Sequence, residues 1–123
     1  EELGGLIEED ESAALLADAV CQDCPIVGVT RGFLDQTGFP REHLLGQNCR
    51  VLLDGVPEVA ISKSGRKNLR DFCRMCRCVG ISQISEATSL QPNARRDGSK
   101  FMNFFMVGLC MIEGHPYILG VQT

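Results

Sequence analysis

The chain has 123 residues, of which 44% are hydrophobic, and its formal net charge at pH 7 is −4. This length fits a single domain, and the hydrophobic fraction is large enough for a packed core. The acidic balance argues against general nucleic-acid binding, and no run reaches the ~20 consecutive apolar residues that a membrane-spanning helix needs. The chain begins without a methionine and ends inside an apolar stretch, which suggests a piece of a longer protein.

The seven cysteines are an odd number, which is not typical of a secreted disulfide scaffold. We therefore expect free thiols and an intracellular, cytoplasmic protein. Cys21 and Cys24, and Cys73 and Cys76 with Cys78 beyond them, have the spacing of zinc ligands. However, 48 residues separate the two groups, whereas compact zinc modules leave about 15–20. A zinc site stays an alternative, and a thioredoxin-like redox pair is a weaker one.

The first half of the chain predicts two strands followed by several short helices. Residues 1–12 are acidic with apolar residues at helical spacing, and we expect a flanking helix or linker there, before a folded domain over 13–123. Glycine, proline and acidic residues mark the turns and the helix ends. The expected elements are strands over 13–20 and 26–30, a turn over 22–25, a helix over 31–38, a helix that begins at Pro40 and ends before Gly46, a turn or two of helix over 48–53 and a loop over 54–57.

The second half predicts one long helix and three antiparallel strands. The helix covers 63–78, and its basic residues form one stripe, consisting of Arg66, Arg70, Arg74 and Arg77. For Arg74 and Arg77 we expect only a solvated basic face. Turn signals at 95–98 and 113–115 connect strands over 84–95, 100–112 and 116–123. Pro92 makes the first of these an edge strand. The fold class is therefore α+β, a five-stranded antiparallel sheet with short helices packed on one face.

Strand periodicity places three carboxamides on the inner face of this sheet, namely Asn93, Asn103 and Gln122. A buried amide without a partner costs about 1–3 kcal/mol, so these groups require polar partners. One interpretation is that they bond to one another or to the backbone. The other is a planar heterocycle, because each carboxamide offers both a donor and an acceptor to the edge of such a ring.

The opposite face of the last strands is also apolar, with Met102, Phe104 and Met106 at alternate positions. A sheet with one face in water does not show this pattern. We therefore expect the outer face to be covered by the N-terminal segment, by chain beyond Thr123 or by another subunit.

A polar triplet, Asn48, Cys49 and Arg50, interrupts two apolar runs. A lone cysteine beside a guanidinium suggests a reactive thiol next to a phosphate-binding group, because arginine donates two parallel hydrogen bonds to phosphate. The alternative is that Cys49 is a small buried hydrophobic residue, as most free cysteines are.

From about Asp18 to Thr123 the chain resembles a PAS domain of the light-oxygen-voltage (LOV) class. The resemblance rests on several motifs that occur in order, and the most specific are Gly46-Gln47-Asn48-Cys49-Arg50-Val51-Leu52, Asn93-x-Arg95-Arg96-Asp97-Gly98-Ser99-Lys100-Phe101-Met102-Asn103 and Gly120-Val121-Gln122-Thr123. It implies a flavin-binding blue-light photoreceptor in which Cys49 forms a reversible cysteinyl-flavin C4a adduct on illumination. Gln122 would sit at flavin N5 and O4 and relay the change in hydrogen bonding. The resemblance implies no enzyme activity in this segment.

The same resemblance implies the other cofactor-binding residues. Asn48 and Arg50 would hold the ribityl-phosphate tail, and Arg70, with Arg66 as a rival, would be the second phosphate contact. The pyrimidine edge and the ring faces would meet Asn93, Asn103, Phe105 and Leu53. FMN is the expected flavin and FAD stays open. The implied signalling route runs through the sheet to flanking helices, a homodimer partner or an effector.

The sequence departs from the family pattern at four places. Leu53 stands where the family usually has glutamine, Gln47 replaces a usual arginine, Cys24 replaces a usual asparagine, and the segment from Cys49 to Asn93 is long. Leu53 removes a hydrogen bond near the flavin. These departures leave a second interpretation, a PAS module that is not photoactive and serves only protein contact.

Overall fold

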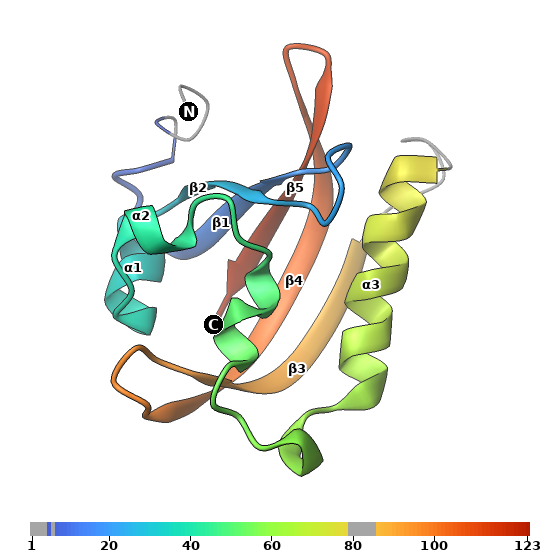
Figure 1. Cartoon of the computed structure of the whole chain (residues 1–123). Coiled ribbons are helices and arrows are strands. Elements are labelled where there is room, and N and C mark those ends of the chain that lie inside the picture. Colours follow the sequence, from blue (N-terminus) through green and yellow to red (C-terminus); the bar gives the residue numbers. More distant parts are fainter. Residues whose placement is uncertain (1–4, 6, 79–85) are drawn as a thin grey trace.

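The computed structural model describes residue 5, residues 7–78 and residues 86–123. Five strands form one antiparallel sheet, and the helices lie together on one of its faces (Figure 1). In chain order the elements are β1 (Ala13–Asp18), β2 (Ile26–Val29), α1 (Arg31–Thr37), α2 (Arg41–Leu44), η2 (Cys49–Leu53), η3 (Glu58–Ala60), α3 (Lys63–Cys78), β3 (Glu86–Ala94), β4 (Lys100–Ile112) and β5 (His115–Gln122). The expected α+β fold is confirmed.

The strand order across the sheet is β2-β1-β5-β4-β3. The last strand therefore pairs with the first, Ala13 lying opposite Gln122, which puts β5 in the centre of the sheet. β3 is an edge strand, as Pro92 predicted, because proline cannot donate to a second ladder. The expected β3 began at residue 84, and residues 84–85 lie outside the described part of the chain.

Local sequence signals account for the short helices. Thr30 caps α1, because its hydroxyl accepts a hydrogen bond from the Phe33 amide at 3.1 Å. The helix ends at Gly38, whose φ of 79° lies in the left-handed region that glycine tolerates. η2 is a 3₁₀ helix, and η3 was not expected from the sequence. Residues 7–12 form turns and bends, and the flanking helix or linker expected over 1–12 includes residues outside the described part.

The long helix α3 packs against the edge strand β3 at close range through Gly65. A side-chain carbon added at Gly65 would lie 2.6 Å from the Ser89 hydroxyl oxygen and 3.0 Å from the Gln91 amide nitrogen. Gln91 also fixes the start of the helix, because its amide accepts from the Ser62 amide and donates to the Ser62 carbonyl, both at 2.7 Å. The start of the helix is therefore held close to β3.

The two faces of the sheet differ as the alternation predicted. The hydrophobic core lies between the inner face and the helices, and Leu15, Ile26, Phe33 and Leu44 are among its fully buried side chains. On the outer face five apolar side chains are 39–57% exposed, namely Leu90, Met102, Phe104, Met106 and Val121. Within the described part of the chain, no helix combines the length and the apolar character that crossing a membrane requires.

Candidate functional site

A cavity of about 430 Å³ lies between the inner face of the sheet, helix α3 and η2. Its volume falls within the range of about 300–1,000 Å³ that is typical of small-molecule sites. Every site residue expected from the sequence lines it, namely Asn48, Cys49, Arg50, Leu53, Arg66, Arg70, Asn93, Asn103, Phe105 and Gln122. These residues come from segments more than 70 positions apart, and the fold brings them to one place.

Carboxamides form one wall of this cavity. Asn93, Asn103 and Gln122 are buried on the last three strands. The Asn103 amide nitrogen donates to Asn93 Oδ1 at 2.7 Å and to Gln122 Oε1 at 2.8 Å. Bonding among the amides, one of the two interpretations above, therefore occurs. It does not satisfy the wall completely, because Asn103 Oδ1 is buried and has no hydrogen-bond partner among the described residues.

Two further polar residues belong to this wall and were missed in the sequence. Ser89 and Gln91 lie on β3 at alternate positions with Asn93 and face the same cavity. The period-two alternation of the strand could have identified both. The Ser89 hydroxyl, like Asn103 Oδ1, is buried without a partner in the described part of the chain. Two unpaired polar atoms on one cavity wall indicate a polar ligand, because leaving each unpaired costs about 1–3 kcal/mol.

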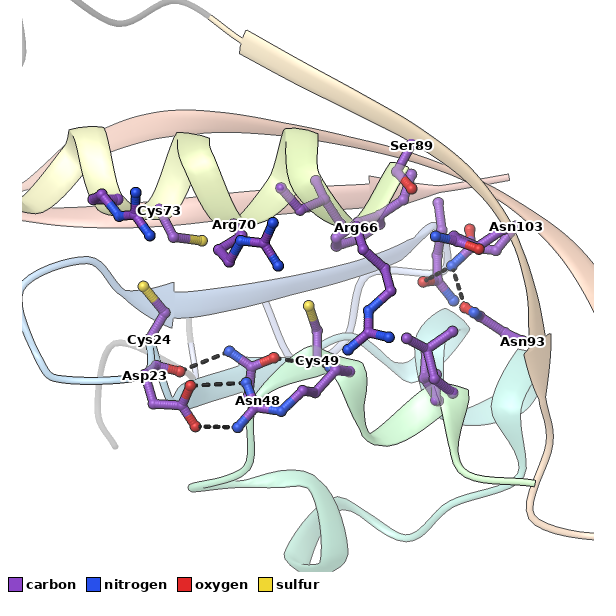
Figure 2. Close-up of a pocket in the computed structure, with 18 residues that line it drawn as sticks. Asp23, Cys24, Asn48, Cys49, Arg66, Arg70, Cys73, Ser89, Asn93 and Asn103 are labelled. Atoms are coloured by element: carbon purple, nitrogen blue, oxygen red, sulfur yellow. Dashed lines mark hydrogen bonds and ion pairs between the residues drawn. The ribbon is translucent and has the colours of Figure 1, made fainter. Parts of the chain in front are cut away.

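Cys49 begins η2 and lies between the amide wall and the basic helix (Figure 2). Asn48 positions it by capping η2, since its Oδ1 accepts from the Arg50 amide at 2.9 Å while its Nδ2 donates to the Asp23 carbonyl at 2.7 Å. Burial raises the pKa of the Cys49 thiol to about 11, because a thiolate is poorly solvated there. Cys49 is therefore a neutral thiol at neutral pH and keeps its proton until another group removes it.

Arg50 forms a bidentate ion pair with Asp23 at the cavity mouth. Its two terminal nitrogens lie 2.8 and 2.6 Å from the two carboxylate oxygens of Asp23. Asp23 lies in the loop between β1 and β2, where Asp23 and Cys24 have φ values of 69° and 45°. Positive φ is uncommon for residues other than glycine and, for cysteine, indicates a locally strained loop. The sequence did not predict this pairing, which occupies the guanidinium expected to bind phosphate.

Three arginines of helix α3 line the opposite side of the mouth. Arg66, Arg70 and Arg74 all contribute to the cavity lining, which confirms that these three residues form one stripe. Arg74 is exposed, as expected for a solvated basic face, and it also contributes to the cavity lining. Arg66 reaches down from the helix toward η2 (Figure 2), and its guanidinium lies 3.9 Å from Glu58. The side chain of Arg77 lies outside the described part of the structure.

Thiols gather at the end of the cavity that lies away from the carboxamides. Cys24 and Cys73 line this end (Figure 2), and their thiols lie within hydrogen-bonding reach of each other. None of the six cysteines whose side chains the structure describes forms a disulfide. Among the residues described here, no three histidine, cysteine or acidic side chains are placed so that they could hold a metal ion. The cysteines whose spacing suggested zinc are therefore placed differently: Cys24 and Cys73 face one cavity, whereas Cys21 is exposed.

The residues present fit a flavin in three respects. The buried amide wall offers donors and acceptors to the edge of a planar ring, and Asn103 Oδ1 and the Ser89 hydroxyl lack partners among the described residues. Phe105 and Leu53 supply apolar contacts, and Arg50, Arg66 and Arg70 surround the mouth where an anionic tail would emerge. Cavities of this kind, apolar with a few convergent polar groups, are typical of cofactor sites.

Comparison with known proteins identifies the family, although no protein-family model matches the chain. It is 32% identical over 103 residues to the blue-light-activated histidine kinase 1 of Erythrobacter litoralis; the match covers 82% of this chain and 25% of that kinase. The solved structure of a LOV domain from an Erythrobacter litoralis blue-light-activated histidine kinase is 27% identical, with a TM-score of 0.74 and coverage of 91% of this chain and 94% of that one. The light-state structure of the blue-light photoreceptor Aureochrome1 LOV is 28% identical, with a TM-score of 0.73 and coverage of 93% and 81%.

The chain spans between 8% and 38% of the length of the curated relatives it matches, so the likeness concerns one domain of larger proteins. Within that domain, the fold agrees with the solved LOV structures, with TM-scores of 0.74 and 0.73. The resemblance expected from the sequence is confirmed, and the chain belongs to the light-oxygen-voltage class of PAS domains, which are flavin-binding blue-light photoreceptor modules.

Proposed function

We propose that this chain is a blue-light sensor module that binds FMN in the cavity between the sheet and α3, with Cys49 as its reactive thiol. The observation that carries this proposal is the placement of one capped, neutral thiol and a buried, incompletely paired amide wall on the same cavity. A flavin supplies the blue-light absorption and a ring carbon that can bond reversibly to a sulfur atom.

Cys49 supplies both the sulfur and a proton. Because burial holds its pKa at about 11, the thiol carries its proton at physiological pH and can deliver it to a basic nitrogen nearby. Asn48 holds the first turn of η2 and thus the direction of the Cys49 side chain. Leu53 lies at the end of η2, and its side chain offers no hydrogen bond to the cavity. We therefore assign to the Gln122 amide the response to the change in hydrogen bonding where the ring would gain the proton.

The preference for FMN follows from the charges at the mouth. Arginine binds a phosphate group through two parallel hydrogen bonds, and Arg50, Arg66 and Arg70 all line the cavity. A second hollow, lined by Asp23, Arg66 and residues between 46 and 61, adjoins the mouth and shares five lining residues with the cavity. FAD would have to place its adenylate half there, beside Asp23, Asp54 and Glu58, which oppose an additional phosphate.

For the output, we propose that changes at Gln122 pass through β5 to the outer face of the sheet. Gln122 is on the inner face, and its neighbour Val121 is on the exposed apolar outer face. A flanking helix or a second copy of the module would cover this face, because exposed apolar surface of this extent indicates a contact site. An effector outside this chain would then respond to the change in that contact.

The thiol assignment is tested by Cys49→Ala, with Cys73→Ala as the matched control on the same cavity. We expect both variants to purify with bound flavin, and only Cys73→Ala to lose and regain its blue absorption when light is switched on and off. Reversible bleaching in Cys49→Ala would refute the assignment.

The second candidate function, a PAS module for protein contact alone, draws on Leu53 and on the exposed outer face. It predicts a protein that remains colourless after incubation with FMN and FAD. A flavin-loaded protein would exclude it.

A further inference from the structure

Gln36 on helix α1 binds the side-chain amide of Gln122. The Gln122 Nε2 atom donates to Gln36 Oε1 at 2.8 Å, and the Gln122 Oε1 atom accepts from Asn103 at 2.8 Å. Gln36 is not part of the cavity lining and was not singled out in the sequence. The Gln122 amide is therefore held at both ends by protein groups, and a chain of amides runs from Asn93 through Asn103 and Gln122 to Gln36.

Helix α1 connects this amide chain to two other parts of the molecule. At its carboxyl end, the Gln36 carbonyl accepts from Arg95 Nε at 2.8 Å and the Thr37 carbonyl accepts from the Arg96 amide at 2.9 Å, which joins α1 to the β3–β4 turn. At its amino end, the Arg31 amide donates to the Glu8 carbonyl at 2.9 Å. The Arg31 guanidinium also pairs with Glu9 at 2.6 Å.

The contact with the N-terminal segment is tight at Gly32. Its amide donates to the Asp10 carbonyl at 3.2 Å, and a side-chain carbon at this position would overlap the backbone of Glu11 and Ser12. Residues 8–12 therefore lie directly on the first turn of α1. If α1 shifts, residues 8–12 must shift with it, because the closely packed backbones leave no free space between them.

We propose that Gln36 is a positioning residue that fixes the orientation of the Gln122 amide and couples it to helix α1 and to residues 8–12. The coupling follows from the chemistry of two facing carboxamides. If Gln122 turns its oxygen toward a donor in the cavity, its oxygen and nitrogen exchange places, and an oxygen then faces Gln36 Oε1. Two acceptors cannot bond, so Gln36 turns in concert or the bond to α1 is lost.

The bond seen here holds Gln122 with its Nε2 toward Gln36, and the second hydrogen of that nitrogen is available to an acceptor in the cavity. Gln36 therefore favours the orientation that suits the dark state. Its coupling to illumination rests on the function proposed above, whereas its hold on Gln122 does not. Removing the Gln36 amide should stabilise the turned orientation relative to this one, and should slow the return to the dark state.

The hold on Gln122 is tested first in flavin-free protein. In nitrogen-15 spectra, we expect Gln36→Leu to speed the exchange of the Gln122 side-chain amide protons with water by about two- to twelvefold, the factor that one ordinary hydrogen bond provides. Gln36→Glu keeps the acceptor and should retain the protection. Equal exchange in Gln36→Leu and the wild type would overturn the proposal.

The coupling to the cavity is tested in flavin-loaded protein through the dark recovery of blue absorption. We expect Gln36→Leu to recover about two- to twelvefold more slowly than the wild type, and Gln36→Glu to recover at the wild-type rate or faster. Arg95→Met is the matched control, because it removes the bond from Arg95 Nε to the Gln36 carbonyl and leaves both side-chain amides in place. An unchanged rate in Gln36→Leu, or the same slowing in Arg95→Met, would overturn the coupling.

Failure of this inference differs from failure of the proposed function. If the loaded wild type does not bleach in blue light, the proposed function fails while the flavin-free exchange experiment still decides the role of Gln36. If the wild type bleaches and recovers but Gln36→Leu matches it in both experiments, only the inference fails.

Discussion

Replacing Asp23 by asparagine should strengthen FMN binding. In the structure both Asp23 carboxylate oxygens bind the Arg50 guanidinium, at 2.8 and 2.6 Å, so the arginine that we assign to the phosphate is already occupied. Asparagine has nearly the same shape and keeps the backbone carbonyl that accepts from Asn48. The substitution removes one negative charge, which both competes with the phosphate for Arg50 and repels the phosphate.

The expected change in the Kd for FMN follows from the solvent exposure of the Arg50–Asp23 ion pair. The Arg50 and Asp23 side chains are 55% and 54% exposed, and exposed ion pairs contribute about 0.2–1 kcal/mol. A bidentate arginine–phosphate contact contributes about 1.5–3 kcal/mol, so the phosphate displaces the carboxylate. The displacement costs at most about 1 kcal/mol, and Asp23→Asn should therefore lower the Kd for FMN by up to about fivefold.

The assay is a titration of flavin-free protein with FMN and with riboflavin, which lacks the phosphate. We expect a gain for FMN, no change for riboflavin, and a smaller gain at high salt because charges at the surface are screened. Glu42→Gln is the matched control, since it removes one carboxylate from helix α2 outside the cavity. Equal gains for both flavins, or no gain for FMN, would refute the assignment of Arg50 to the phosphate.

Three other variants or conditions test separate parts of the site. Gly120→Ala should lower the free energy of unfolding by about 1–3 kcal/mol and weaken flavin binding. The reason is that the added carbon would lie 2.7 Å from Phe105 Cε1 and would push that ring toward the cavity. Chemical denaturation measures the loss of stability, and Phe105→Leu in the same chain should restore both properties. In flavin-free protein the rate of Cys49 alkylation, followed by mass spectrometry, should rise with pH up to about 11 and not level off near the ordinary value of 9.0. The thiol of the unfolded chain loses its proton at a lower pH than the folded one, so the contribution of Cys49 to the free energy of unfolding falls as pH rises from 9.0 to about 11. A plateau of the alkylation rate near pH 9.0 would contradict the raised pKa. Arg50→Ala should raise the Kd for FMN by about 2- to 100-fold, which is the difference between about 1.5–3 kcal/mol for the phosphate contact and about 0.2–1 kcal/mol for the ion pair it replaces. An unchanged flavin occupancy would argue against the contact.

Strand periodicity predicted the faces of the sheet well. Asn103 and Gln122 are buried on the inner face, and Met102 and Phe104 are exposed on the outer face, because successive side chains of a strand must point to opposite sides. Pro92 predicted an edge strand for an equally local reason, the missing backbone donor.

The pairings within the site could not be predicted in this way. Gln36 and Gln122 are 86 positions apart, and Asp23 and Arg50 are 27 apart. Each pairing depends on where the elements pack in three dimensions, which neither periodicity nor turn signals specify. The family resemblance identified side chains that line the cavity, but it could not identify Gln36, which bonds to Gln122, or Asp23, which pairs with Arg50 in the structure.

The same limit applies to the thiols. Spacing alone grouped Cys21 with Cys24 and Cys73 with Cys76, because local patterns compare neighbours in sequence. In the fold, Cys24 and Cys73 face one another across the end of the cavity, while Cys21 lies at the surface.

The central claim is that this cavity holds a flavin within reach of Cys49. The most direct measurement is the absorption spectrum of the purified protein, reconstituted with FMN, in darkness, under blue light and again in darkness. We expect a structured flavin band that disappears under illumination and returns in the dark. A flavin band that stays unchanged under blue light would contradict the role of Cys49, and the absence of any flavin band after reconstitution would contradict the site itself.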